Sequence, residues 1–191
     1  MKDHFLPILQ DHREAFEKSF SEGQLEILEH ISAAIIHCFK NGGKLLLCGN
    51  GGSAADSQHI AAEFIARFKL ERKSLPAIAL TTDTSILTAI ANDYCFERVF
   101  SRQIEGLGNP GDILIGLSTS GNSKNVIEAA KTAAAQGLTV IGFTGESGGA
   151  LAGLCRMTFR AQTKKTPHIQ EVHITALHAV SEVVENQLFS A

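Results

Sequence analysis

Two short segments of the chain carry residue types that can bind an anion. Residues 48–53 read CGNGGS, and residues 118–123 read STSGNS. Glycines let a backbone approach a ligand closely, while hydroxyl groups and free N–H groups at a helix N-terminus donate hydrogen bonds to negative charge. The second segment holds more hydroxyls than a helix cap requires. We therefore expect this serine loop to bind a phosphate monoester, with an N-cap cluster as the plain alternative.

The glycine loop also fits a nucleotide-binding pattern in part. Gly49, Gly51 and Ala54 satisfy the dinucleotide fingerprint GxGxxG/A. That fingerprint expects an acidic residue about 20 residues further on, and Asp83 comes about ten residues too late. The sequence has no GxxxxGK[ST] motif. These observations favour a phosphorylated small molecule over a nucleotide, with a tight strand-to-helix turn as the simpler interpretation of the glycine loop.

A histidine and a carboxylate follow the glycine loop at helical spacing. His59 and Glu63 are four residues apart, so that they lie on one face of a helix. Such a pair can share a metal ion or act in acid–base chemistry. The alternative is a hydrogen bond on a solvated helix face.

A second group of polar residues lies near the C-terminus, among them Gln170, Glu171, His173 and His178. At 3.6 residues per turn, His178 has about the same angular position as Glu171 and lies within about 80° of Gln170. Spacing alone therefore leaves Gln170 and Glu171 as equal partners for His178. His173 fits a buried core position in this apolar helix.

The surrounding pattern predicts the elements that position these groups. Short apolar runs at 45–48, 77–80, 113–117, 140–143 and 157–159 alternate with helical stretches. Continuous apolar runs indicate strands that are covered on both faces, and their alternation with helices predicts a parallel sheet. Helical spacing from about 11 to 39 predicts one or two N-terminal helices, and 167–188 predicts a long closing helix. Ligands of such sheets bind beyond the carboxyl ends of the strands, where both loops fall.

These predictions amount to an α/β three-layer sandwich with a central parallel sheet, preceded by N-terminal helices. We expect one domain over residues 1–191, in which 1–43 is the N-terminal helical segment.

Composition narrows the class of partner. The chain has 191 residues, of which 44% are hydrophobic and 19% charged, with a formal net charge of -3. This is an ordinary globular composition, and the basic residues form no cluster that would bind nucleic acid. No apolar run approaches the roughly 18 residues of a membrane span, and the N-terminus lacks a signal-peptide core. We expect a cytoplasmic protein that binds a small anion at a local site.

Taken together, these motifs resemble the sugar isomerase (SIS) domain family and, within it, the phosphoheptose isomerases. The matching segments follow the order found in the family and span nearly all of the chain from residue 44: CGNGGS at 48–53, HIAAE at 59–63, Asn92-Asp93, STSGNS at 118–123, Gly148-Gly149, and IQEVHITALH at 169–178. The resemblance implies a flavodoxin-like SIS fold.

The resemblance also implies an activity. Phosphoheptose isomerases convert D-sedoheptulose 7-phosphate to D-glycero-D-manno-heptose 7-phosphate through an enediol, a precursor step toward ADP-heptose and lipopolysaccharide. The family is homotetrameric, with sites at subunit contacts, which gives residues 1–43 an expected role in oligomerisation. It also holds zinc, which implies one Zn²⁺ per subunit here.

Site residues follow from the resemblance position by position. The expected zinc ligands are His59, Glu63, Gln170 and His178, with Glu63 as catalytic base and His178 as catalytic acid. The expected substrate-binding residues are Asn50, Gly51, Gly52, Ser53, Glu63, Asn92, Asp93, Ser118, Thr119, Ser120, Ser123 and Gln170. Isomerisation through an enediol needs a base that moves a proton between C1 and C2 and an acid that serves the two oxygens, and these residue types suit those roles.

Two other functions remain open. A relative of the isomerases, the DnaA initiator-associating protein, shares the loops but binds the replication initiator without catalysis, and it departs from the isomerases at the positions equivalent to Glu63 and His178. This chain keeps both residues, which favours an enzyme. An isomerase of another sugar phosphate is the second alternative.

Overall fold

A five-stranded parallel sheet forms the centre of the computed structural model, which describes residues 2–190. The strand order is β2-β1-β3-β4-β5, and every neighbouring pair is parallel. The strands are β1 (Leu45–Cys48), β2 (Ala77–Ala79), β3 (Ile113–Ser118), β4 (Thr139–Gly145) and β5 (Met157–Ala161). Each strand falls on one of the five apolar runs, and burial of both sheet faces explains why those runs do not alternate with polar residues. The predicted α/β class is confirmed.

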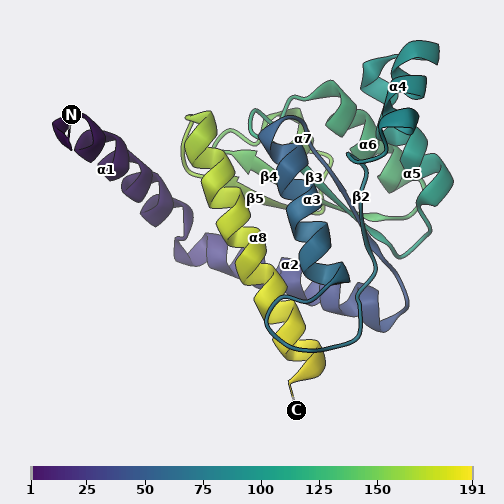
Figure 1. The fold of residues 1–191 in the computed structure, drawn as a ribbon, viewed down its shortest axis with the longest axis horizontal. Coiled ribbons are helices and arrows are strands. Elements are labelled where there is room, and N and C mark those ends of the chain that lie inside the picture. Colours follow the sequence, from purple (N-terminus) through teal and green to yellow (C-terminus); the bar gives the residue numbers. More distant parts are fainter. Residues whose placement is uncertain (1, 191) are drawn as a thin grey trace.

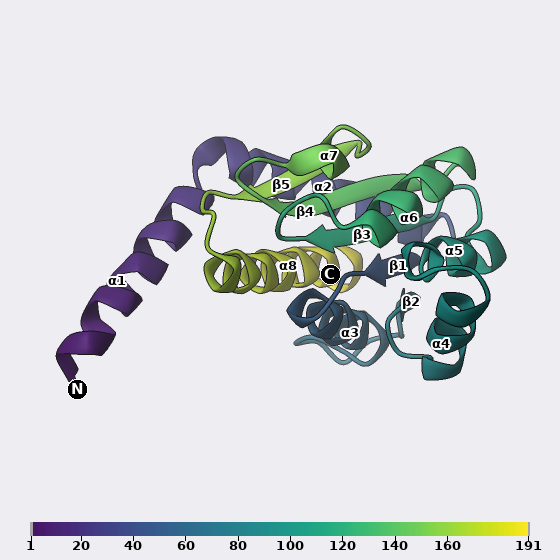
Figure 2. The same ribbon diagram turned by 90° about the horizontal axis from the view of Figure 1, so that it is seen from above.

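Helices cover both faces of the sheet (Figures 1 and 2). One apolar core lies between the sheet and the helices α2 (Glu22–Lys40), α3 (Gly52–Ile65) and α8 (Thr166–Phe189). The other core lies between the opposite face and α5 (Ser101–Leu107), α6 (Lys124–Ala135) and α7 (Gly149–Ala152). The helix α4 (Thr84–Asp93) and the 3-10 turn η1 (Phe96–Arg98) lie at the edge of this second layer. The long closing helix predicted over 167–188 is α8.

The N-terminal segment forms two helices that separate at Ser21. The first, α1 (Lys2–Ser19), projects away from the rest of the fold (Figure 1). It begins at Lys2, ahead of residue 11 where helical spacing becomes clear, and it continues through Pro7, which lacks the N–H for one intrahelical bond. Large apolar side chains on α1 are exposed: Phe5, Leu6, Ile8, Leu9 and Phe16. Within residues 2–190, no helix combines the length and the apolar character that a membrane crossing requires.

The strand order places the two loops side by side. The chain leaves β1 into α3, which packs on one face, and leaves β3 into α6, which packs on the other. The strands β1 and β3 are neighbours in the sheet. This is the point where the order reverses in a 2-1-3-4-5 sheet, and ligands of such folds bind in the crevice that opens there.

Candidate functional site

The glycine loop turns sharply from β1 into α3. Gly51 has φ +56°, a left-handed value that disfavours other residues. A Cβ on Gly52 would lie 2.5 Å from the Nε2 atom of Gln170, so the amide of Gln170 rests directly on this turn. Ser53 is buried in the first turn of α3, and within residues 2–190 no side chain caps this helix. The helix N-terminus therefore keeps its positive end available to an anion.

The serine loop makes the corresponding turn from β3 into α6. The hydroxyls of Ser118 and Ser123 lie 2.9 Å apart, and Ser118 is buried. Gly121 has φ +67°, and a Cβ there would lie 2.1 Å from the carbonyl oxygen of Gly148. The loop is thus packed against the Gly148-Gly149 turn, which explains why glycines occur in both segments.

A hollow of about 250 Å³ opens beside the serine loop. Thr119 and Ser120 line it, together with Ser147, Thr163 and Lys164. Lys164 forms an ion pair with Glu146 at 3.3 Å, and its side chain is largely exposed. Hydroxyls and one cation at a helix N-terminus make a suitable place for a phosphate group.

A pair of asparagines joins the two loops. Asn50 donates to Oδ1 of Asn125 at 2.9 Å, and Asn125 donates to Oδ1 of Asn50 at 2.7 Å. Asn125 is buried in the first turn of α6. The reciprocal pair fixes the distance between the two anion-binding turns. Sequence analysis missed this role, because nothing in the local pattern connects positions 75 residues apart.

The titratable residues meet further along α3. His59 Nε2 lies 3.0 Å from Oε1 of Glu63 and 3.1 Å from Nε2 of His178 on α8. One ligand atom from each of the three residues lies within 4.8 Å of the others. The side chain of His59 is 51% exposed and that of Glu63 only 21%, so a ligand reaches the cluster from the His59 side.

The electrostatics of the cluster favour the neutral form of His178 over the protonated form. Burial lowers the pKa of His178, the neighbouring His59 lowers it further, and Glu63 partly opposes this. A neutral imidazole is the form that binds a metal, and two imidazole nitrogens with one carboxylate oxygen are a donor set that zinc accepts. The three residues therefore fit a metal ion. They also fit an acid–base pair, in which a carboxylate and an imidazole exchange protons with one substrate.

The remaining polar residues of α8 separate clearly. Gln170 lies eight residues before His178, roughly 12 Å along the helix axis, and faces the glycine loop. Glu171 faces α1 instead, where it pairs with His12. His173 is fully buried, its Nε2 lies 2.9 Å from the carbonyl oxygen of Thr144, and burial lowers its pKa to about 4. Of the two residues that spacing could not separate, Gln170 is the one that faces the glycine loop.

Two predicted substrate-binding residues lie at the C-terminal end of α4. Asn92 and Asp93 end α4, where both are exposed and Asn92 donates to Asp93 at 2.8 Å. Within residues 2–190, no hydrogen bond joins either of them to the loops or to the histidine cluster. Their place in the substrate-binding site stays a prediction.

One aromatic contact of the cluster was not predicted from the sequence. The ring of Phe68, in the segment that follows α3, lies 5.7 Å from the ring of His178 between centroids. An isolated aromatic residue after a helix carries no signal of such a contact in the sequence.

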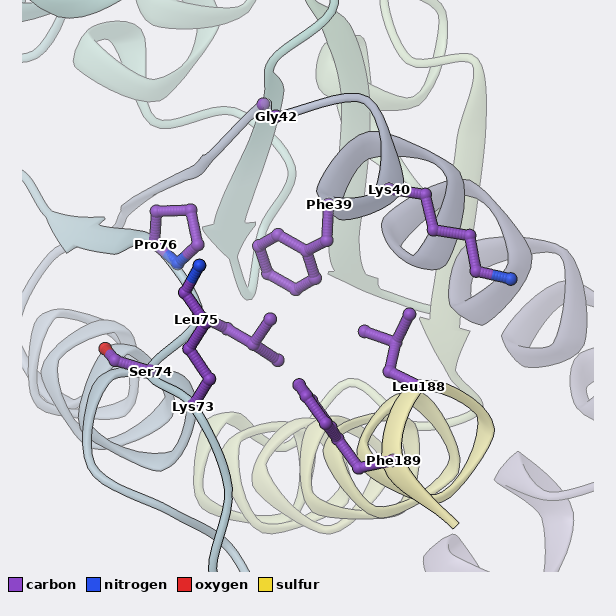
Figure 3. A pocket seen from close by; sticks show the side chains of 10 residues that line it. Phe39, Lys40, Gly42, Lys73, Ser74, Leu75, Pro76, Leu188 and Phe189 are labelled. Carbon is purple, nitrogen blue, oxygen red and sulfur yellow. The ribbon is translucent and has the colours of Figure 1, made fainter. Parts of the chain in front are cut away.

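Another hollow lies at the opposite edge of the sheet (Figure 3). It has a volume of about 310 Å³ and is lined at the ends of α2 and α8 and where the chain enters β1 and β2. Phe39, Leu75, Leu188 and Phe189 turn toward one another across it. The strands begin at this edge, whereas ligands of parallel sheets bind where strands end. We therefore place the chemistry at the loops and the histidine cluster.

Comparison with known proteins gives consistent results. The family model described as SIS domain matches residues 10–145. A phosphoheptose isomerase of Roseiflexus sp. (strain RS-1) is 57% identical over 168 residues, which cover 88% of this chain and 85% of that protein. A phosphoheptose isomerase of Desulfovibrio desulfuricans is 50% identical over 192 residues, covering 99% of this chain and 91% of the relative.

A solved structure extends the comparison to three dimensions. The phosphoheptose isomerase structure from Neisseria gonorrhoeae superimposes with a TM-score of 0.91 at 40% sequence identity. The match covers 97% of this chain and 98% of that one. The similarity therefore includes the N-terminal helices as well as the sheet.

Proposed function

The chain belongs to the SIS-domain family and, within it, to the phosphoheptose isomerases, and on that premise we propose how its residues perform the reaction. The activity is the aldose–ketose isomerisation of D-sedoheptulose 7-phosphate to D-glycero-D-manno-heptose 7-phosphate, an intramolecular oxidoreduction. The observation that supports the roles of the catalytic residues is that His178 of α8 meets His59 and Glu63 on α3, the helix that begins at the glycine loop. A non-enzymatic role is not favoured, because the close relatives are isomerases and both acid–base residues are present.

The phosphate and the sugar chain bind at the two turns. In this proposal, Ser118, Thr119, Ser120 and Ser123 take the phosphate through hydroxyl and backbone donors, and the N-terminus of α6 favours its charge. Residues 50–53 and Gln170 hold the sugar hydroxyls along the start of α3. The Asn50–Asn125 pair supports this division because it fixes one turn relative to the other.

Proton transfer falls to Glu63 and His178. Glu63 takes the proton from C1 of the ketose while His178 donates a proton to the oxygen on C2, which gives the enediol. Glu63 then returns its proton to C2 as His178 accepts the proton of the oxygen on C1, which gives the aldose. The cycle begins with His178 protonated, and its lowered pKa makes this protonated form the stronger donor to the oxygen on C2.

A zinc ion, one per subunit, is the proposed cofactor. His59, Glu63 and His178 would hold it with Gln170 as a fourth donor, and when bound it would polarise the substrate carbonyl. Glu63 has two carboxylate oxygens, so that one oxygen can bind the metal while the other accepts a proton. In this structure the amide of Gln170 rests on Gly52. Replacing Gln170 and measuring Zn²⁺ affinity tests whether it is the fourth ligand.

We also propose a homotetramer in which a neighbouring subunit completes each site. The exposed apolar side chains of α1 support a role of residues 1–43 in oligomerisation. The exposed position of Asn92 and Asp93, which form no hydrogen bond to either loop within residues 2–190, supports a contribution to a neighbour's site. Residues 1–191 then form one SIS domain, acting in the cytoplasm in the supply of heptose for ADP-heptose and lipopolysaccharide.

The decisive experiment is incubation of the purified protein with sedoheptulose 7-phosphate and detection of the aldoheptose phosphate by NMR. We expect turnover without added nucleotide or NAD, loss of turnover on chelation, and recovery with Zn²⁺. Absence of turnover together with tight binding to the replication initiator would identify a binding protein. Faster conversion of another ketose phosphate would change the substrate that we assign to the enzyme. Activity that survives complete metal removal would exclude an essential zinc.

A further inference from the structure

A buried ion pair lies beside the histidine cluster. Arg72 and Glu185 are each 1% exposed, and Nε of Arg72 lies 2.8 Å from Oε1 of Glu185. Glu185 also accepts hydrogen bonds from three successive backbone N–H groups, those of Phe68, Lys69 and Leu70, at 3.0, 2.7 and 2.9 Å. Every oxygen of this carboxylate is therefore occupied by the segment that follows α3.

The other end of the pair holds the helix that carries Glu63. The guanidinium of Arg72 donates to the carbonyl oxygen of Glu63 and to that of Phe64, each at 2.8 Å. These carbonyls belong to the last turn of α3, where backbone oxygens have no partner within the helix. The backbone N–H of Leu75 also donates to the carbonyl oxygen of Phe64. Arg72 supplies the donor to the carbonyl oxygen of Glu63 and a positive charge that suits a helix C-terminus.

The same pair reaches His178 from the side of α8. Glu185 follows His178 by seven residues, so that the two side chains leave α8 roughly 20° apart in projection and share one face. The segment that Glu185 holds includes Phe68, whose ring lies against that of His178. One ion pair thus fixes three things: the end of α3, the Phe68 ring, and the face of α8 that carries His178.

We propose that Arg72 and Glu185 are positioning residues for the isomerase reaction, which set the placement of Glu63 relative to His178. The proposal rests on the isomerase function given above and adds residues that touch neither substrate nor metal. Stability alone does not account for the pair, because a buried ion pair contributes little net stability compared with well-packed apolar residues. An apolar pair would not reproduce the hydrogen bond from Arg72 to the carbonyl oxygen of Glu63.

The test compares Arg72→Met and Arg72→Lys with a matched control. Lys69 pairs with Glu182 at 2.7 Å and joins the same segment to the same helix, but both side chains are exposed and, within residues 2–190, neither forms a hydrogen bond or ion pair with α3. Lys69→Gln is therefore the control. For each protein we would measure kcat and KM for sedoheptulose 7-phosphate well below its melting temperature, and the affinity of the metal-free protein for Zn²⁺ by competition with a chromophoric chelator.

We expect Arg72→Met to lower kcat and Zn²⁺ affinity by about 10- to 100-fold, the range for groups that orient metal ligands. KM should stay within about twofold, because the phosphate loop is remote from the pair. Arg72→Lys keeps the charge but loses the forked donors, so it should recover part of the loss. Lys69→Gln should leave all three quantities unchanged.

Wild-type kcat and Zn²⁺ affinity in a folded Arg72→Met protein would overturn the proposal, as would a loss that disappears on cooling. If Arg72→Met does not fold, Arg72→Lys decides by the same criteria. The Zn²⁺ measurement needs no turnover, so that it separates this proposal from the proposed function: wild-type protein without isomerase activity would refute the function alone.

Discussion

The two ends of α3 are built in different ways. At its N-terminus lies the glycine loop, and the serine loop that leads into α6 lies beside it. Each loop is one short segment of the chain, and its shape comes from glycine backbone geometry and nearby hydroxyls. At its C-terminal half, His59 and Glu63 meet His178, which is 119 residues away from His59 along the chain. The turns at the N-terminal end take their shape from residues that are close in the chain. The histidine cluster at the C-terminal half exists only when α3 and α8 are packed together.

This difference separates binding from chemistry. An anion needs donors and a helix dipole, which a short loop supplies by itself. Proton transfer needs an acid and a base held within hydrogen-bond reach of the same substrate atoms, which two helices supply only if their separation is fixed. Damage to the loops should therefore change affinity, whereas damage to the helix pair should change turnover.

The sharpest test of this division is Glu63→Gln. The substitution keeps size and hydrogen-bonding capacity but removes the base, so that turnover should fall by roughly 10²–10⁴, the range for loss of general acid–base catalysis. Substrate affinity, measured by calorimetry, should change little. Solvent-deuterium incorporation at the carbon next to the carbonyl should fall in parallel with turnover.

A matched control for this variant lies on α8. Glu171→Gln removes a carboxylate that faces α1 and pairs with His12, and it should leave turnover within about twofold, as surface changes usually do. Retention of most turnover and exchange by Glu63→Gln would show that another group is the base. Glu171 and His173 are the nearest other candidates on α8, and full burial, which lowers the pKa of His173 to about 4, makes His173 a poor one.

Much of the local end of the molecule could be predicted from the sequence. The five strands were recognisable because strands buried on both faces are continuous apolar runs. Both loops were recognisable because their glycines and hydroxyls are adjacent in the chain. The His59–Glu63 pair was recognisable because four-residue spacing in a helix fixes a contact.

The contacts between distant parts of the chain, at either end of α3, could not be predicted in the same way. Arg72 and Glu185 are 113 residues apart, and charged residues in a sequence usually indicate a solvated surface. The pairing of Asn50 with Asn125 depends on which strands are neighbours. Helical spacing left Gln170 and Glu171 equivalent, and only the packing of α1 and α3 on different sides of α8 separates them.

An acid titration should weaken the non-local end selectively. Burial alone would raise the pKa of Glu185, but the three backbone N–H groups and Arg72 outweigh it and bring the pKa down to about 2 from 4.5. A depressed pKa means that this stabilisation is complete above pH 4.5 and is lost as the pH falls toward 2. The full effect is about 3 kcal/mol, the linkage equivalent of that shift.

Urea unfolding between pH 5 and pH 2.5 would measure this effect in the wild type and in Glu185→Gln. The free energy by which the wild type exceeds the variant should shrink as the pH falls. The buried neutral His173 also makes the protein less stable in acid, but its effect falls between pH 6.5 and its pKa of about 4. The change below pH 4 therefore reports on Glu185. A constant difference across that window would mean that Glu185 does not titrate with folding.

The smallest predicted effect concerns the local end, where Ser120→Ala and Ser123→Ala remove two hydroxyls. Neither loop contains an acidic or basic side chain, so the loops themselves offer neutral donors to a charged phosphate, beside the Lys164 side chain that lines the neighbouring hollow. Loss of hydrogen bonds to a charged group costs roughly 1–3 kcal/mol, which corresponds to a rise in KM of about 5- to 150-fold. The value of kcat should stay near that of the wild type, because the histidine cluster is untouched.

Ser74→Ala, an exposed serine beside the hollow at the opposite edge of the sheet, serves as the control. An unchanged KM in the double variant would place the phosphate elsewhere. A fall in kcat with KM unchanged would show that the loop and the cluster act as one unit, which would contradict the separation of binding from chemistry along α3.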